Sequence, residues 1–155
     1  MKEIRVGEHV VKLDDDIAAL VERTGVVVMK DSVGGMRAHV RMKLLSRVVM
    51  PAARGYVTDH INSNSLDNRR ENLQVISVKM NNMKKRTTAT PGVSLDKTSG
   101  RYFALVGSRR RRSFRLLLEA QRAADAYRRS LGIKGMPLNF PEVGEYGFDG
   151  TQRVS

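Results

Sequence analysis

Asparagine is concentrated in one stretch of this chain of 155 residues. The asparagines of this stretch are Asn62, Asn64, Asn68, Asn72, Asn81 and Asn82. Their side chains compete with the backbone for its hydrogen bonds, so such a run is costly inside regular structure unless the side chains cap turns or bind something. We therefore expect the chain to fold here into short elements joined by ordered turns.

The residues around the asparagines predict a strand, a long loop, a second strand and a helix. The corresponding segments are YVTDHI at 56–61, the turn-rich residues 62–72, LQVIS at 73–77 and VKMNNMKK at 78–85. Folded in this order, the end of the first strand comes to lie beside the start of the helix.

Three polar residues fall where these elements are expected to meet: Asp59, His60 and Asn81. Asp59 and Asn81 offer hard oxygen ligands of the kind that Mg²⁺ accepts, while the ion keeps its other positions for water and phosphate. His60 follows Asp59 and therefore points to the opposite side of the pleat. Its imidazole titrates at about pH 6.5, so it can serve as general base toward a water aligned on the same phosphate. A lone histidine on a strand is usually structural, as we expect for His9 and His39.

The first fifty residues predict a compact, mixed fold. One of the aspartates at 14–16 can cap a helix over residues 17–25, which stops at Gly25. The further expected elements are a strand at 26–29, a turn at 31–35, a strand at 36–42 and a short helix at 43–50, before Pro51.

A polar, basic segment at 84–92 containing Pro-Gly is the candidate linker to a second module. Beyond it, short strands are expected at 92–96, 101–107 and 113–117, followed by a helix at 119–131. The last fifteen residues are weakly patterned, and we expect them to form a loosely held tail.

Basic charge is concentrated in this second module. The chain carries 28 Lys and Arg against 16 Asp and Glu, a formal net charge of +12. Four of the basic residues are consecutive: Arg109, Arg110, Arg111 and Arg112. Such density favours a polyanion, because each neutralised phosphate releases condensed counterions. A solvated face is the alternative, but the scarcity of compensating acidic residues favours nucleic acid.

Several classes of protein are disfavoured by composition. Cysteine is absent and histidine occurs three times, which excludes disulfides, thiolate zinc sites and cysteine nucleophiles. No apolar run reaches about 18 residues, and acidic residues occupy the place of a signal peptide's apolar stretch. We expect a soluble, cytoplasmic protein without a membrane partner.

The run from Tyr56 to Lys85 resembles the HNH (His-Asn-His, ββα-metal) nuclease motif in its phage homing-endonuclease form. The matching residues, without gaps, are Asp59, His60, Asp67, Asn68, Arg69, Arg70, Asn72, Leu73 and Asn81. One departure is the pair Ser46-Arg47, where the family usually carries His-Arg. The cell implied by this resemblance is a bacterium or a phage-infected host.

The resemblance also implies roles for the matched residues. Asp59 and Asn81 would hold one divalent metal per site, Mg²⁺ or Mn²⁺, while His60 activates water and Asn72 fixes the loop and orients the base. The ion would stabilise the crowded phosphate and its 3′ leaving oxygen. Arg69 and Arg70 become candidate phosphate contacts.

Residues from about 90 to 141 resemble the plant ethylene-response-type (AP-two) DNA-binding domain, which has three strands and one packing helix. The matching landmarks are Gly92-Val93, Arg101-Tyr102-x-Ala104, Ala123-Ala124-x-Ala126-Tyr127 and Leu138-Asn139-Phe140. The resemblance implies that the sheet lies in the major groove, where arginines bind guanine edges and phosphates. The candidates for DNA binding are Arg101 and Arg109–Arg112. Tyr102 stands where the family usually has Trp, and Phe114-Arg115-Leu116 replaces a glycine-containing turn, so the base preference does not transfer.

The expected fold class is α+β: a ββα-metal nuclease core with its lead-in at 1–86, a three-stranded sheet plus helix at 87–141, and a tail at 142–155. The expected function is a monomeric, metal-dependent, site-specific endonuclease that hydrolyses or nicks double-stranded DNA. The alternative is a sequence-specific DNA-binding regulator with a catalytically weak or inactive nuclease fold, which Ser46 favours. An RNA-binding or structural phage protein is disfavoured, because eight Phe and Tyr provide few stacking platforms.

Overall fold

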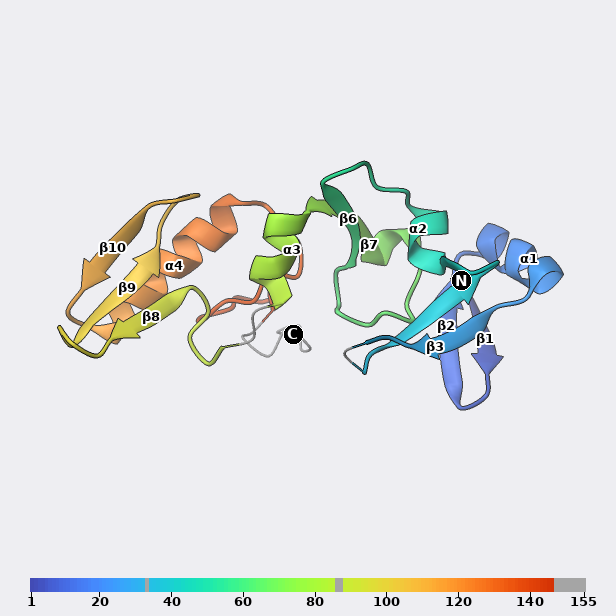
Figure 1. Ribbon diagram of the computed structural model, residues 1–155, viewed down its shortest axis with the longest axis horizontal. Coiled ribbons are helices and arrows are strands. Elements are labelled where there is room, and N and C mark those ends of the chain that lie inside the picture. Colours follow the sequence, from blue (N-terminus) through green and yellow to red (C-terminus); the bar gives the residue numbers. More distant parts are fainter. Residues whose placement is uncertain (33, 86–87, 147–155) are drawn as a thin grey trace. The chain divides into compact units, whose positions relative to one another are not determined.

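The computed structural model of the chain describes residues 1–32, 34–85 and 88–146. It shows a mixed α+β chain in which small antiparallel sheets of two or three strands are combined with helices (Figure 1). The chain divides into two compact units, Met1–Asn81 and Asn82–Ser155, whereas we expected the boundary after residue 86. No helix in the described part of the chain has the length and apolarity needed to span a membrane.

The first unit begins with a hairpin and a helix: β1 (Lys2–Val6), β2 (His9–Leu13) and α1 (Asp15–Thr24). The sequence pattern did not predict β1, because only Ile4 and Val6 alternate with charged residues along it. Gly25 ends α1 with a φ of 75°, a conformation that glycine adopts without steric cost. Asp14 occupies the N-cap of α1, but its carboxylate makes no capping bond and instead accepts hydrogen bonds from Arg70.

A three-stranded sheet of order β3-β4-β5 and a short helix follow: β3 (Val27–Lys30), β4 (Met36–Val40), β5 (Lys43–Leu44) and α2 (Leu45–Val49). The described residues of the expected turn at 31–35 confirm it, with the amide of Asp31 donating to the carbonyl of Gly35 at 2.7 Å, whereas Val33 lies outside the described residues. The expected strand at 36–42 is wrong at its end. Arg41 and Met42 adopt positive φ values of 47° and 62° and form a tight turn into β5.

The core of the first unit is an apolar cluster from β2, α1, β4 and α2. Its buried members are Val11, Leu13, Ile17, Ala18, Val21, Ala38, Val40 and Leu45. The strand residues among them alternate and the helix residues recur at helical spacing, as burial on one side requires. Leu66, which lies in the asparagine-rich loop, packs against this cluster and so ties the loop to it.

The asparagine-rich stretch forms β6 (Tyr56–His60), a loop ending in the short 3₁₀ turn η1 (Arg70–Asn72), β7 (Leu73–Ser77) and α3 (Val78–Lys85). The predicted order of strand, loop, strand and helix is therefore confirmed. β6 and β7 pair antiparallel, with Asp59 opposite Gln74 and His60 opposite Leu73. α3 extends through Lys85, so the first part of the expected linker is helical, whereas Arg86 and Thr87 lie outside the described residues.

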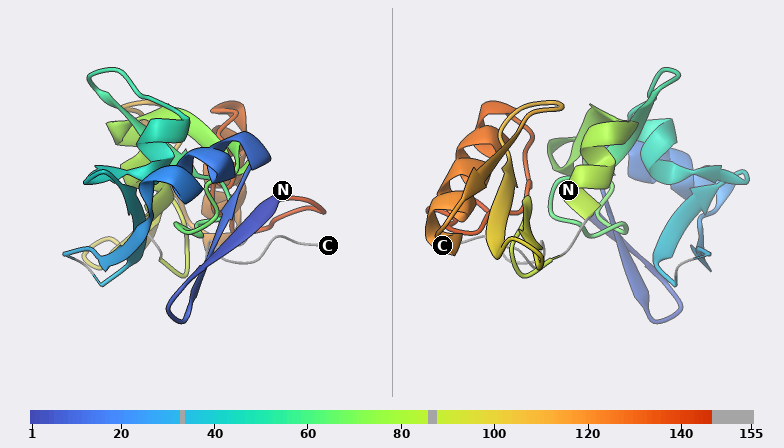
Figure 2. Two further views of the ribbon diagram at one scale, coloured as in Figure 1. Left: turned by 90° about the vertical axis from the view of Figure 1, so that its right-hand side faces the viewer. Right: turned by 60° about the vertical axis from the view of Figure 1, so that its left-hand side comes forward.

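The second unit contains a three-stranded antiparallel sheet of order β10-β9-β8 and one long helix: β8 (Val93–Asp96), β9 (Arg101–Leu105), β10 (Arg111–Phe114) and α4 (Leu117–Ser130). Figure 2 shows α4 lying along one face of this sheet. Ala104 of β9 and Ala120 and Ala124 of α4 are fully buried between the two layers. These small side chains allow the helix to approach the sheet closely.

The last strand and the helix both begin two residues earlier than expected. The strand that we placed at 113–117 runs from Arg111 to Phe114, because Phe114 pairs with Tyr102 and both rings pack against the alanines of the core. Leu116 is the extended N-cap residue of α4, so the helix starts at Leu117 rather than at 119. Two of the four consecutive arginines are consequently strand residues rather than turn residues.

Residues after α4 are held by buried polar groups. Asp125 is buried and accepts hydrogen bonds from the amides of Asn139 and Phe140 at 2.9 and 2.8 Å. Arg128, also buried, donates to the carbonyl of Pro137 at 3.0 Å. The expected tail begins in ordered structure, since residue 146 forms a bridge with Pro137.

Candidate active site

The β6–β7 hairpin carries two adjacent polar side chains that are almost completely buried. Asp59 and His60 are 9% and 8% exposed. Gln74, opposite Asp59, donates from its Nε2 to Asp59 Oδ2 at 2.9 Å and so orients the carboxylate. Successive strand residues point to opposite sides of the pleat, and the imidazole of His60 accordingly meets a different partner, Asn68.

Asn72 closes the base of the loop through both ends of its side chain. Its Oδ1 accepts from the amide of Asn62 at 3.1 Å, and its Nδ2 donates to Asn62 Oδ1 at 2.9 Å and to the carbonyl of Asp67 at 2.8 Å. The backbone adds a bond from the amide of Ile61 to the carbonyl of Asn72 at 2.8 Å. Asn72 is thus a loop-closing residue that lies next to the Asp59–His60 end of β6.

Asn68 is the residue that contacts the imidazole. It is 1% exposed, and its Oδ1 lies 3.3 Å from His60 Nε2. Its amide donates to the carbonyl of Lys12 in β2 at 2.9 Å. Asn68 was among the residues that match the motif. The sequence spacing gave no reason, however, to assign it a role different from that of the other asparagines in the loop.

Arg69 is held inside the loop by acidic neighbours. Its Nε and Nη2 each donate to one oxygen of Asp67 at 2.7 Å, and it also forms an ion pair with Glu71. Burial of Asp67 opposes its ionisation, but the hydrogen bonds and charge of Arg69 outweigh that effect and keep the pKa of Asp67 below its ordinary value. That Arg69 contacts phosphate remains a prediction, and its guanidinium is already paired with Asp67 and Glu71.

Arg70 joins the loop to the start of α1. Its guanidinium donates to both carboxylate oxygens of Asp16, at 2.8 and 2.6 Å, and to Asp14 at 3.1 Å. The side-chain bond from Arg70 lowers the pKa of Asp16. Arg70 is about half exposed, and its predicted role at phosphate likewise remains a prediction.

The metal ligands predicted from the sequence are Asp59 and Asn81, and this assignment remains a prediction. Within the ranges 1–32, 34–85 and 88–146, no group of three or more His, Cys, Asp or Glu side chains could hold an ion. A carboxylate and an amide oxygen fit a hard ion that retains most of its water, as Mg²⁺ does. The bond from Gln74 to Asp59 is the kind of support that orients a ligating carboxylate. Asn81 lies on α3, directly after β7, and is partly exposed.

The candidate DNA-binding arginines lie on β9, β10 and the turn between them. Arg109 and Arg110 are in the turn, Arg111 and Arg112 are on β10, and all four are exposed. The guanidinium carbon of Arg112 lies 5.7 Å from the centre of the Phe114 ring, which holds it in a cation–π arrangement.

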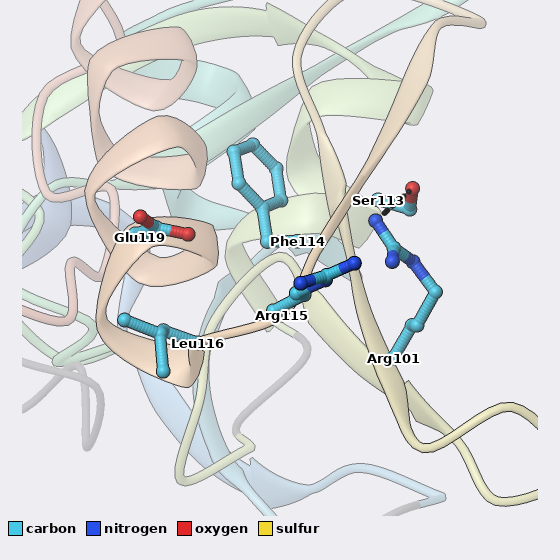
Figure 3. A pocket seen from close by; sticks show the side chains of 6 residues that line it. All are labelled: Arg101, Ser113, Phe114, Arg115, Leu116 and Glu119. Atoms are coloured by element: carbon cyan, nitrogen blue, oxygen red, sulfur yellow. Dashed lines mark hydrogen bonds between the residues drawn. The ribbon is translucent and has the colours of Figure 1, made fainter.

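Arg101 belongs to the sheet face opposite α4, because its neighbour Tyr102 packs on the helix side. Its Nη2 donates to Ser113 Oγ at 3.1 Å, and the two residues line a hollow of about 490 Å³ (Figure 3). Arg115 and Glu119 are also part of its wall. The hollow is therefore lined by polar side chains from both the sheet and α4, with Phe114 and Leu116 as its apolar part.

No protein-family model matches the chain, and no curated protein or solved structure matches it. The residues of the chain itself are thus the basis for a functional assignment. The most informative of them are the buried pair Asp59–His60 and the asparagine loop that surrounds it.

Proposed function

We propose that this chain is a metal-dependent endonuclease of the HNH homing type, which hydrolyses or nicks phosphodiester bonds in double-stranded DNA. The observation that carries the proposal is the adjacent buried pair Asp59–His60 at the end of β6, beside the loop closed by Asn72. Burying two ionisable side chains on a five-residue strand is costly, and such cost is concentrated at functional sites.

The proposed roles follow from the chemistry of each side chain. Asp59 and Asn81 hold a divalent ion, Mg²⁺ or Mn²⁺, through oxygen. When bound, this ion supplies electrostatic stabilisation of the phosphate and of the leaving 3′ oxygen. His60 accepts the proton of the attacking water, and Asn72 keeps the loop closed beside it.

Selection of the DNA site falls to the second unit in this proposal. Arg101 and Arg111 lie on the sheet face opposite α4, Arg109 and Arg110 lie in the turn, and Arg112 lies on the helix side beside Phe114. Together they make the surface of β9, β10 and their turn cationic. Backbone phosphates attract such a surface in a strongly salt-dependent manner, and guanine edges accept bidentate arginine bonds. With one Asp59–His60 pair per chain, a monomer nicks one strand at each encounter.

A DNA-binding regulator without nuclease activity is the second candidate. It is favoured by Ser46, which is buried at the start of α2 where the HNH family usually has histidine. The regulator would use the same arginines on DNA and retain Asp59 and His60 for stability alone.

The experiment that separates the two candidates is cleavage of a supercoiled plasmid library carrying randomised inserts, with Mg²⁺ or Mn²⁺ and with chelator as the blank. Wild type is compared with His60→Ala and with His9→Ala, a control in the same unit whose histidine is partly exposed. We expect metal-dependent cleavage by wild type and His9→Ala, and its loss in His60→Ala with DNA affinity within a few-fold of wild type. Cleavage by His60→Ala at the wild-type rate would refute the site, and selective binding of inserts without cutting would support the regulator.

A further inference from the structure

The turn between β4 and β5 holds two residues in a backbone conformation that side chains rarely adopt. Arg41 and Met42 have φ values of 47° and 62°, and the strands pair on either side of them through Val40 and Lys43. Two-residue hairpin turns with both φ values positive normally contain Asn-Gly or a similar pair, because other residues are strained there. Strain of this kind is concentrated at functional positions. Arginine and methionine at this turn therefore indicate that their side chains are needed there.

Met42 carries an apolar side chain at the tip of this turn. It is 82% exposed, the highest fraction among the large apolar side chains that the structure describes. Its neighbours Arg41 and Lys43 are exposed as well, and within the described ranges neither of them forms an ion pair. An apolar tip is thus flanked on both sides by a cation.

The turn has a rigid base in the core of the first unit. Val40 comes directly before the turn and Leu45 directly after β5, and they are 4% and 0% exposed. Arg41 and Lys43 line a hollow of about 190 Å³ at this base together with Leu20 of α1. A side chain that is presented on a fixed base loses little conformational freedom when it binds, which favours binding.

The same base is connected to the strand that carries the candidate site. α2 follows β5 directly and ends at its C-cap residue Met50. The carbonyl of Met50 accepts a hydrogen bond of 2.7 Å from the hydroxyl of Thr58 in β6, and Asp59 and His60 follow Thr58 on that strand. The turn and the candidate site therefore belong to one packed unit, so a ligand held by the turn is also held relative to the site.

The charge around the turn favours a polyanion over an apolar protein partner. No Asp or Glu occurs in the sequence between Asp31 and Asp59. The cations Arg41, Lys43 and Arg47 lie on the turn and on α2, and all three are exposed. An apolar partner would match Met42 alone, whereas a DNA groove offers phosphates to the cations and base faces to the thioether.

We propose that Met42 is a wedge that enters the minor groove of double-stranded DNA and unstacks one base step, while Arg41 and Lys43 bind the phosphates beside it. This inference rests on the proposed function, in which the first unit cuts DNA. Proteins that bend DNA from the minor groove insert apolar side chains, methionine among them, between base pairs. The resulting kink bends the duplex toward its major groove and opens the minor groove toward the protein, next to the backbone that this unit is proposed to cut.

Unwinding of a plasmid measures the wedge without a known target site and without cleavage. Full-length protein is incubated with relaxed, covalently closed plasmid and a type IB topoisomerase, in the presence of chelator. The linking number is then read from the topoisomers after the protein is removed. Because an inserted side chain lowers the local twist, we expect wild type to leave the plasmid negatively supercoiled. Variants are compared at equal bound fraction, which a gel shift at the same salt concentration measures.

Substitutions of Met42 separate the wedge from the strained backbone. Met42→Ala removes the apolar tip, and Met42→Asn replaces it with a polar residue that tolerates positive φ. We expect both variants to lose the change in linking number, although Met42→Asn should unfold at a temperature no lower than wild type. Met42→Leu keeps an apolar wedge and should unwind the plasmid as wild type does. Met29→Ala is the matched control, because Met29 is 44% exposed in the same unit but lies on the regular strand β3.

The flanking cations are tested by the double substitution of Arg41 and Lys43 with alanine. We expect the slope of log K against log salt for DNA binding to decrease by about 0.9 for each phosphate contact that is lost. An unchanged slope would overturn the role of these two residues.

The results for the wedge and for the endonuclease can differ. A wild type that binds the plasmid without changing its linking number overturns the wedge, as does normal unwinding by folded Met42→Ala or an equal loss in Met29→Ala. Unwinding that depends on Met42, in a wild type that cleaves no DNA from the randomised library, refutes the endonuclease and leaves the wedge established. Metal-dependent cleavage without unwinding leaves the endonuclease standing and refutes only the wedge.

Discussion

Arg69 and Arg70 in the first unit, and Arg109 to Arg112 in the second, are consecutive arginines in the sequence but have opposite electrostatic surroundings. The first two are held by carboxylates of Asp67, Asp14 and Asp16. The other four are exposed and, among the residues that the structure describes, form no ion pair. Consecutive arginines can therefore either form ion pairs with carboxylates of the same chain or remain exposed, where they are accessible to a polyanion.

Arg69 finds its carboxylates two positions away in the sequence, whereas the fold brings those of Arg70 from a distant element. Arg70 is separated from Asp14 by 56 positions, and only the packing of the loop against α1 makes them neighbours. An arginine already paired must lose a carboxylate before it can bind phosphate, whereas an exposed arginine loses only water. We therefore expect the two groups to respond differently to substitution, with the exposed group governing DNA affinity and the paired group governing stability.

The largest expected effect is on DNA affinity when Arg109, Arg110, Arg111 and Arg112 are all replaced by alanine. We expect affinity to fall on the order of 10- to 100-fold at about 0.15 M salt, and the slope of log K against log salt to decrease by about 0.9 for each phosphate that is no longer neutralised. Titration of labelled duplex DNA at several salt concentrations measures both. Arg122→Ala, at an exposed position on α4, is the control. An unchanged slope in the fourfold variant would move the DNA surface elsewhere on the molecule.

The next largest effect is on stability, when Asp67 is replaced by asparagine. This substitution removes the buried carboxylate of the Asp67–Arg69 ion pair. We expect the free energy of unfolding at neutral pH to fall by about 1–3 kcal/mol. Because the pKa of Asp67 is lower in the folded state than the unfolded value of about 3.9, its contribution is present above that pH and is lost as the pH falls through the lower, folded pKa. The free energy of unfolding of Asp67→Asn should therefore decrease less on acidification than that of the wild type.

Urea unfolding measured from neutral to acidic pH tests this prediction. Glu71→Gln is the matched control, because Glu71 also pairs with Arg69 but is largely exposed, so we expect little change. Equal losses for the two variants would show that burial of Asp67 makes no difference to the strength of the pair.

The smallest expected effect is that of Arg70→Ala, which breaks an exposed bond network to Asp14 and Asp16. Exposed ion pairs contribute little, so we expect a slight decrease in the thermal unfolding midpoint and no change in the salt slope of DNA binding. Differential scanning fluorimetry measures the unfolding midpoint, and the same DNA titration measures the salt slope. Arg54→Ala, which removes another exposed arginine, is the control. A decrease of about one in the salt slope would contradict the comparison and make Arg70 a phosphate contact.

Local pattern predicted much of the fold around the candidate site. The strand at 73–77 and the helix at 78–85 have the predicted bounds, and the described residues of the turn at 31–35 form it as expected. The errors occur where a local signal competes with tertiary packing. β10 begins at Arg111 because Phe114 packs on the helix side of the sheet, and β1 forms because β2 offers it a partner.

The order of elements, the adjacency of Asp59 and His60 and the asparagine-rich loop were determined by the sequence alone, because periodicity and turn preference act over a few residues. Which asparagine contacts the imidazole, and the pairing of Arg70, were decided only by the tertiary structure. Asn68 reaches His60 because Lys12 of a distant hairpin fixes its backbone, and Arg70 is paired because α1 presents Asp14 and Asp16 to it. Contacts between residues far apart in the chain depend on how separate elements pack, and no pattern confined to one segment contains that information.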